Sequence, residues 1–300
     1  MSSTLDITRR IKSVKNTRQI TRAMEKISAI KMRKSNIAVM KSRRYVSLAE
    51  EILQTISGRI EKHNHPLLKI REERRVGYLV ISPDRGLCGG VPTKLLQEIS
   101  SHATDGISSK NIQWYTMGKK LRDSLVRLGA HLEADFGAAP PAPHITQCAT
   151  LIKMLVDDYT TGKIDVVYLA WTDFKNTLVQ KAMIKKILPF EITESRGQEN
   201  TPPFGHPSTE GNNTSLQATQ YTCEPNSNEA LDPLLIRILE LQLYQAILES
   251  NASEHSARMV AMRNASENAG DLINDLTLEY NQVRQSGITR EIAEISAGSM

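Results

Sequence analysis

The sequence predicts an α/β protein in which long N- and C-terminal helices form an antiparallel coiled coil, with a smaller α/β domain between them in the chain. Three observations support this prediction. Residues 1–57 contain neither glycine nor proline, and residues 241–287 repeat apolar or small side chains at alternating steps of four and three. Residues 67–190 instead alternate short β-branched segments with helix-like segments. A four-three repeat sustained over several heptads is typical of a helix that packs along another helix.

The N-terminal segment is expected to be one helix that ends near Gly58, the first glycine of the chain. At about 1.5 Å per residue it would be roughly 80 Å long. It carries thirteen Lys and Arg against four Asp and Glu, a net charge of +9. The apolar positions that recur along it are Ile7, Ile11, Val14, Ile20, Met24, Ile27, Leu48, Ile52 and Ile56.

The central segment predicts a parallel, Rossmann-like sheet, because strands and helices alternate at the spacing of crossover units. The expected strands are residues 76–82, 111–117 and 164–171, and the expected helices are residues 93–101, 119–128 and 146–160. Residues 177–188 read as a further strand with no crossover helix after it, which favours an antiparallel edge. The proline-rich residues 138–143 are expected to form a loop.

The C-terminal segment predicts a helix of roughly 100 Å over residues 234–300, which is too long to be stable without a partner helix in the same chain. Its net charge is −4, from five arginines and nine acids, opposite in sign to the N-terminal helix. The expected divisions are residues 1–60, 67–192, a flexible linker at 193–230, and 231–300. The four-three repeat comprises Leu241, Gln245, Leu248, Ala252, His255, Met259, Met262, Ser266, Ala269, Ile273, Leu276, Tyr280, Val283 and Gly287.

No catalytic, metal or cofactor site is expected from the sequence. The loop DRGLCGG at residues 84–90 follows the first strand, but it matches neither the dinucleotide-binding nor the Walker A pattern, and its glycines favour a tight turn. Three cysteines with no paired spacing predict a reducing compartment without a disulfide framework. The seven histidines lack metal-ligand spacing, and His255 is expected to be a polar residue of the helix seam.

Two other classes of function compete with a coiled-coil interaction protein. A basic N-terminal helix could serve as a nucleic-acid-binding arm, although Tyr45 is the only aromatic residue in residues 1–57. An α/β domain could hold a small-molecule enzyme, but no phosphate loop or acid/base pair supports this. No stretch of about eighteen apolar residues predicts a membrane span, so no direct membrane insertion is expected.

Five segments, spread across nearly the whole chain, carry a resemblance to one known family. They are IKSVKNTRQITRAM at residues 11–24, the loop at residues 84–90, FKNTLVQ at 174–180, SEHSARM at 253–259 and YNQVRQSGITREIAE at 280–294. The first resembles the N-terminal signature of the γ subunit family of F-type ATP synthase. The next two resemble the central motifs of that family and the last two its C-terminal signature, in family order.

The resemblance implies a non-catalytic rotor shaft that couples ion flow through a membrane sector to ATP synthesis and hydrolysis in a catalytic hexamer. The implied partners are the α and β subunits of the hexamer, the ε subunit and the c-ring, with no nucleic acid and no cofactor. The foot region that faces ε and the c-ring would lie near residues 221–225. A position on the cytoplasmic face of a bacterial inner membrane is expected, because no convincing leader precedes the first helix.

Individual residues are assigned through the same resemblance. Met24 matches a shaft position near the contact with β subunits, and four C-terminal residues match positions linked with coupling: Arg258, Gln285, Thr289 and Glu291. Packing in the seam or on the surface of the coiled coil is the alternative for all five. Ile288, Ile292 and Ile295 are expected to form a bearing tip inside the hexamer. Gly287 and Arg290 depart from the residues that are common in the family, and Gly287 should cost about 1 kcal/mol of helix propensity unless close packing requires it.

Overall fold

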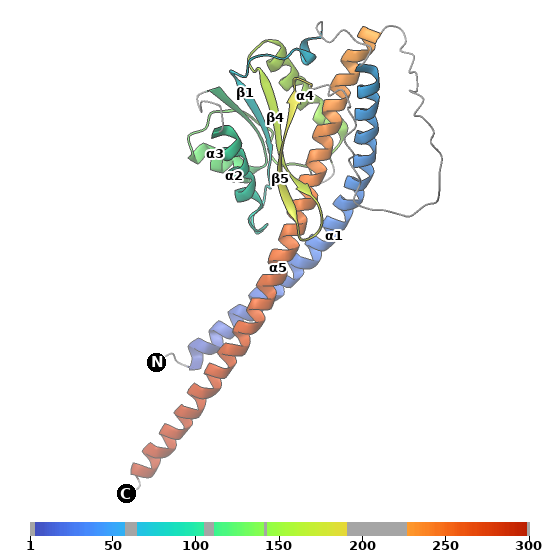
Figure 1. The fold of residues 1–300 in the computed structure, drawn as a ribbon. Helices are drawn as coiled ribbons and strands as arrows, with labels where there is room; N and C mark the ends of the chain where they lie inside the picture. The colour runs from blue at the N-terminus through green and yellow to red at the C-terminus, as the bar shows by residue number, and fades with distance from the viewer. Residues whose placement is uncertain (1–3, 58–64, 105–110, 141–142, 191–226, 299–300) are drawn as a thin grey trace, which may run out of the picture.

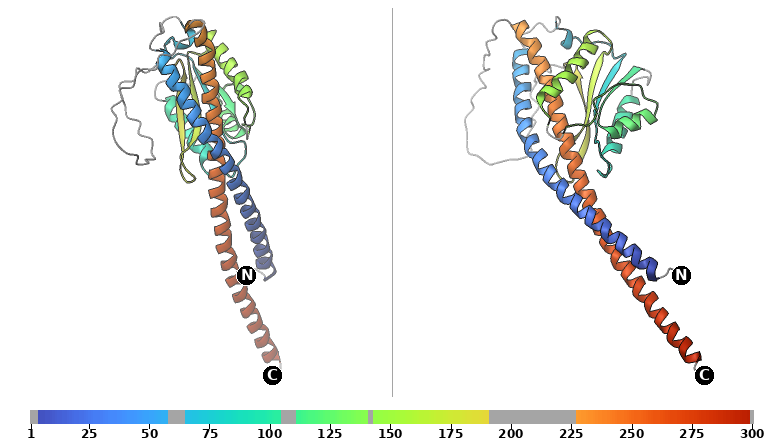
Figure 2. Two further views of the ribbon diagram at one scale, coloured as in Figure 1. Left: turned by 90° about the vertical axis from the view of Figure 1, so that its right-hand side faces the viewer. Right: turned by 180° about the vertical axis from the view of Figure 1, so that it is seen from behind.

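The computed structural model describes residues 4–57, 65–104, 111–140, 143–190 and 227–298. Two helices dominate it: α1, Thr4–Ser57, and α5, Ser227–Gly298. They run side by side in opposite directions, and the C-terminal end of α5 extends well beyond the start of α1 (Figures 1 and 2). The antiparallel coiled coil expected from the sequence is therefore confirmed.

The α5 side of the helix seam follows the predicted repeat. Leu248, Ala252, Met262 and Ser266 are buried, as are the further members Ala269, Ile273 and Leu276. Gly270 lies beside this seam, and a Cβ added to it would stand 3.1 Å from Nη2 of Arg18. The helices therefore approach closely where α5 carries a small residue.

The α1 side of the seam differs from the prediction in its middle part. Ile20, Ile27 and Leu48 are 61%, 54% and 53% exposed. A four-three repeat counted from Ile7 falls on Thr21 and Ser28, one residue after Ile20 and Ile27. It therefore places small hydroxyl side chains against α5. Among the described side chains of α1, the buried ones are Ile7, Thr21, Ser28, Ser35, Val39, Ser42 and Val46. The side chains of Ile52 and Ile56 lie outside the described residues.

The α/β domain contains one five-stranded sheet in the order β3-β2-β1-β4-β5. Strands β1 (Val76–Ile81), β2 (Ile112–Met117), β3 (Leu132–Asp135) and β4 (Val166–Phe174) are parallel, and β5 (Gln180–Leu188) pairs antiparallel with β4. The parallel sheet and its antiparallel edge were both predicted. Strand β3 was not, because its four residues, LEAD, contain no β-branched side chain and remain partly exposed.

Helices cover both faces of the sheet, as Figure 1 shows. Helices α2 (Val91–Thr104) and α3 (Lys119–Arg127) pack on one face through a core that includes Tyr78, Leu95 and Trp114. On the other face, α4 (Ile145–Thr160) and the N-terminal half of α5 pack on Leu79 and Tyr115. A short 3₁₀ helix, Pro66–Leu68, precedes β1. Because the N-terminal half of α5 packs on the sheet and also pairs with α1, one helix belongs to both parts of the molecule.

Candidate functional site: the shaft and its attachment to the α/β domain

The free end of α5 presents most of the residues assigned to coupling. Gln285, Thr289 and Glu291 are exposed, and the C-terminal end of α5 extends beyond the start of α1 (Figure 2). Ile288, Ile292 and Ile295 are 48%, 59% and 72% exposed, and their spacing of four and three places them on one face of the helix. Nothing lies within 4 Å of a Cβ added to Gly287, so no close packing compensates for its low helix propensity.

Met24 lies on α1, not at the free end of α5, and is partly buried beside the seam. Its neighbours Ala23 and Ile20 are exposed. The structure therefore does not bring Met24 together with the C-terminal residues; it places them at successive levels of one rod.

Arg258 occupies a different environment from the other assigned residues, because it is buried within the chain. Its Nε donates to the carbonyl oxygen of Gly86 at 3.3 Å, and its Nη2 donates to that of Arg85 at 3.2 Å and to Oε1 of Glu254 at 2.6 Å. Arg258 thus ties α5 to the loop after β1. In this loop Leu87 has a φ of 62° and is 60% exposed.

His255 is a partly buried neighbour of Arg258 on the seam, as predicted, and its Nδ1 lies 3.4 Å from Nη1 of Arg258. Burial, together with the positive charges of Arg258 and Lys31, lowers its pKa to about 4. The imidazole is consequently neutral at pH 7 and can accept a hydrogen bond from the arginine.

A second polar cluster joins α1, β4 and α5 where the coiled coil passes the sheet. Arg43 of α1 donates from Nε to Oε1 of Glu249 at 2.9 Å and from Nη2 to Oδ1 of Asp173 at 2.7 Å. Nε1 of Trp171 donates to Oε2 of Glu249 at 2.8 Å. Nη2 of Arg43 also donates to the carbonyl oxygen of Phe174 at 3.0 Å. One guanidinium therefore fixes the N-terminal helix to both the sheet and the C-terminal helix.

The cluster holds two carboxylates for one arginine. Burial and the negative charge of Glu249 raise the pKa of Asp173, against the opposing effect of Arg43 and Lys175. Sequence reasoning missed these residues. The available signal was Glu249 itself, a single acid next to Leu248 in an apolar stretch, since a buried carboxylate requires a partner.

Comparison with known proteins identifies the family to which this shaft belongs. Residues 3–300 match the protein family described as ATP synthase. The ATP synthase γ chain of Chloroflexus aurantiacus is 38% identical over 303 residues, which cover 100% of this chain and 98% of that protein. The γ chain of Acidithiobacillus ferrooxidans is 37% identical, with 100% and 99% of the two chains covered. The chain belongs to the ATP synthase γ chain family.

Solved structures show that the fold is that of central stalks. A chain of the mitochondrial ATP synthase of Euglena gracilis in rotational state 3 superposes with a TM-score of 0.67 at 18% identity, covering 98% of this chain and 92% of that one. A chain of the Tetrahymena thermophila enzyme, from its central stalk and c-ring, superposes with a TM-score of 0.59 at 20% identity, covering 82% and 99%. The fold of this chain is therefore similar to that of these two chains.

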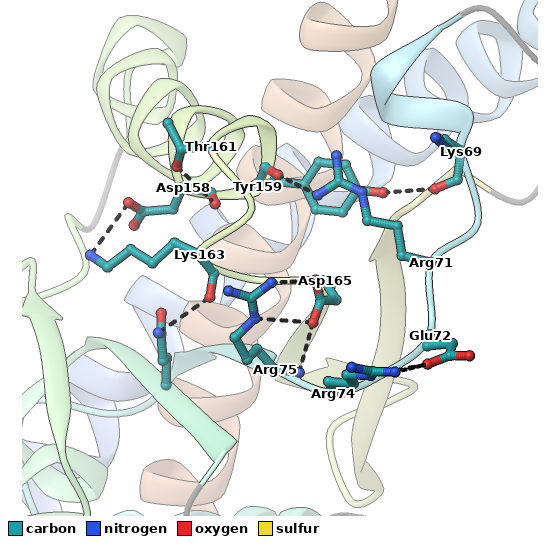
Figure 3. A network of polar contacts seen from close by, with 11 residues as sticks. Lys69, Arg71, Glu72, Arg74, Arg75, Asp158, Tyr159, Thr161, Lys163 and Asp165 are labelled. Carbon is teal, nitrogen blue, oxygen red and sulfur yellow. Dashed lines mark hydrogen bonds and ion pairs between the residues drawn. The ribbon is translucent and has the colours of Figure 1, made fainter.

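Several other ionisable groups of the chain make internal contacts. Beside β1, three nitrogens of Arg75 contact the carboxylate of Asp165 at 2.9 to 3.2 Å, and Nη1 of Arg71 donates to the carbonyl oxygen of Tyr159 at 2.8 Å (Figure 3). Although burial acts to raise the pKa of Asp165, the hydrogen bonds and charge of Arg75 lower it overall. This network joins the segment before β1 to the loop after α4.

The cysteines within the described residues have the character of buried packing groups. Burial raises the pKa of Cys88, and it raises that of Cys148 to about 11, so both are thiols at pH 7. A thiol is a far weaker nucleophile than a thiolate. Cys223 and the expected foot region at residues 221–225 lie outside the described residues. Within the described ranges, no cluster of three or more potential metal ligands occurs, and no helix is long and apolar enough to span a membrane.

Proposed function

We propose that this chain is the rotor shaft of an F-type ATP synthase, coupling ion flow through the membrane sector to ATP synthesis and hydrolysis in the catalytic hexamer. Full-length similarity to ATP synthase γ chains is the observation that carries the proposal. The elongated coiled coil with a single-helix end agrees with it (Figure 2). The alternative of a nucleic-acid-binding protein has no support in these comparisons.

The mechanism depends on the asymmetry of the rod. A shaft without threefold symmetry, standing inside a ring of three equivalent catalytic sites, contacts each site differently. Its rotation then shifts each site in turn among states of different nucleotide affinity, because differential contact energy shifts a conformational population. This chain has a basic and an acidic helix, and one of them ends before the other. Both features make its surface uneven around the axis.

Torque must pass between the α/β domain and the shaft, and two polar contacts lie where these parts meet. Arg43 joins α1 to β4 and α5, and Arg258 joins α5 to the loop after β1. Charged hydrogen bonds of this kind fix direction as well as distance. We infer that both clamps transmit torque, and that Arg258 acts in coupling through the loop at residues 84–90.

The surrounding partners follow from the same proposal. The α and β subunits would enclose the coiled coil, with Met24, Gln285, Thr289 and Glu291 as shaft contacts and the three tip isoleucines as the bearing. The ε subunit and the c-ring would contact the α/β domain and the foot. The chain would have no catalytic site of its own and would lie peripherally on the cytoplasmic face of a bacterial inner membrane.

The test is assembly followed by a measurement of coupling. Native mass spectrometry of the complex purified through this chain should give one copy per three α and three β subunits. In membrane vesicles, ATP hydrolysis by the complex should drive proton uptake. Recovery of the chain as a stable homo-oligomer without these subunits would contradict the proposal.

A further inference from the structure

Two carboxyl groups share one edge of a single guanidinium where α1 and α5 pass β4. Nε and Nη2 are neighbours on the planar group of Arg43, and such neighbouring nitrogens commonly bind the two oxygens of one carboxylate. Here Nε donates to Oε1 of Glu249 at 2.9 Å, and Nη2 donates to Oδ1 of Asp173 at 2.7 Å. The shared edge therefore holds two different carboxyl groups close to each other.

The surroundings of this pair increase the repulsion between two ionised carboxylates. The side chains of Glu249 and Asp173 are 3% and 16% exposed, so water and salt screen their charges poorly. Lys175, just after β4, attracts Asp173 less than Arg43 does, and Lys181, opposite Asp173 on β5, is exposed. The apolar cluster beside the pair contains Val39, Phe174, Leu248 and Ala252, with the partly buried Tyr244 packed against it. Two carboxylates held this close favour binding of one proton.

The hydrogen bonds of the pair indicate which group carries that proton. Glu249 accepts from three donors: Nε of Arg43, Nε1 of Trp171 at 2.8 Å and Nε2 of Gln245 at 3.0 Å. Asp173 accepts from Arg43 through Oδ1, so its other oxygen can hold a proton and donate it to Glu249. Burial raises the pKa of Asp173, and the charge of Glu249 and a hydrogen bond with it act in the same direction, against the neighbouring cations.

We propose that Asp173 and Glu249 share one proton, and that this proton makes their contact with Arg43 a pH-dependent lock between the shaft and the α/β domain. With the proton bound, Asp173 donates to Glu249, and Arg43 holds α1 against both groups. When the proton leaves, the two carboxylates repel each other across the contact between β4 and α5, and one guanidinium neutralises only one of them. The lock therefore weakens as pH rises. It is a property of this chain alone and goes beyond the proposed rotor function.

Urea unfolding of the full-length chain between pH 4.5 and pH 8 tests the proposal. Because the pKa of Asp173 is raised in the folded chain, this stabilisation is fully present below the ordinary value of 3.8 and is lost as pH rises through the raised value. Asp173→Asn keeps the shape of the protonated side chain and has no proton to lose in this range. The unfolding equilibrium constant of the unmodified chain, divided by that of the variant, should rise by up to about tenfold per pH unit and then become constant. Groups that titrate in both proteins, such as His255, cancel in this ratio.

Glu249→Gln tests the same proton from the other side of the pair. It leaves Asp173 as the one carboxylate on this edge of Arg43, so the same rise of the ratio with pH is expected, and the test stands if either variant fails to fold. Asp271→Asn, which removes an exposed carboxyl group from α5, is the control for the loss of one acid. A ratio that stays constant with pH in a folded Asp173 or Glu249 variant overturns the proposal. An equal pH dependence of the ratio in the Asp271 variant would show a general charge effect and would also overturn it.

Discussion

At the residue scale, the polar groups that matter most are buried or partly buried ones that connect distant parts of the chain. Arg43, Asp173 and Glu249 are separated by more than 70 residues from one another, and Arg258 reaches a loop about 170 residues earlier. The contacts of Arg43 with Asp173 and of Arg258 with the loop cross from a long helix to the α/β domain, and the contact of Arg43 with Glu249 joins the two long helices. Their removal should therefore affect stability and coupling together.

Arg43→Met should destabilise the chain by about 2 kcal/mol. The substitution leaves Glu249, which is 3% exposed, without its cation, and loss of one partner of a fully buried pair costs roughly 3–5 kcal/mol. The cost is smaller here because the side chain of Arg43 is 38% exposed. Urea unfolding measures the change. Adding Glu249→Gln should recover more than half of the loss, and Arg44→Met, at an exposed neighbouring position, should have little effect.

His255 should make stability depend on pH on the acid side of neutrality. Its pKa is about 4 in the folded chain, below the ordinary value of 6.5, so the unfolded chain binds more protons between these values. This contribution to stability is present above pH 6.5 and is lost as pH falls towards 4, by roughly 2 kcal/mol. His255→Gln should lack this loss, as measured by urea unfolding at pH 7 and pH 4.5. Parallel pH profiles for the two proteins would contradict the pKa shift.

At the scale of elements, the helices and strands that could be predicted are those that sequence periodicity and residue propensity determine. The α5 repeat, the parallel strands and the antiparallel edge follow from local patterns that tertiary structure did not override. The prediction for the α1 seam was wrong in the middle of the helix, because it followed the hydrophobic residues Ile20 and Ile27. The heptad register instead places Thr21 and Ser28 against α5. Clusters such as Arg43 with Asp173 could not be predicted, since they depend on how a helix passes over a strand 130 residues away.

Because Ser28 and not Ile27 lies in the α1 seam, a substitution of Ser28 should be more destabilising than one of Ile27. Ser28→Leu should destabilise the chain by about 1–3 kcal/mol, because Ser28 is 3% exposed and a larger side chain overpacks the interface. Leucine has the higher helix propensity, so backbone preference does not explain the loss. Ile27→Ser, at a 54% exposed position, should change stability by no more than about 0.5 kcal/mol. Thermal unfolding followed by circular dichroism measures both changes in stability. If Ile27→Ser were the more destabilising of the two, Ile27 and not Ser28 would lie in the seam.

At the scale of the whole molecule, the chain combines a domain with a core of its own and a rod that has little core beyond the seam. The two parts share α5, which is packed on the sheet at its start and is exposed on all described sides at its end. Folding stability should therefore reside in the upper part of the molecule. The free end of α5 contributes few contacts within the chain, which leaves its exposed isoleucines available to other subunits.

Removal of residues 288–300 should separate folding from coupling. Their described side chains are exposed, so the isolated chain should lose no more than about 2 °C in melting temperature. The complex with α and β subunits should still contain one copy of the truncated chain, but ATP-driven proton uptake should fall more than ATP hydrolysis does. Replacing Ile288, Ile292 and Ile295 together by serine should produce the same imbalance if apolar contact supports the tip. Full coupling in both variants would place the bearing elsewhere on the shaft, whereas loss of assembly would show that the tip is needed to hold the hexamer together.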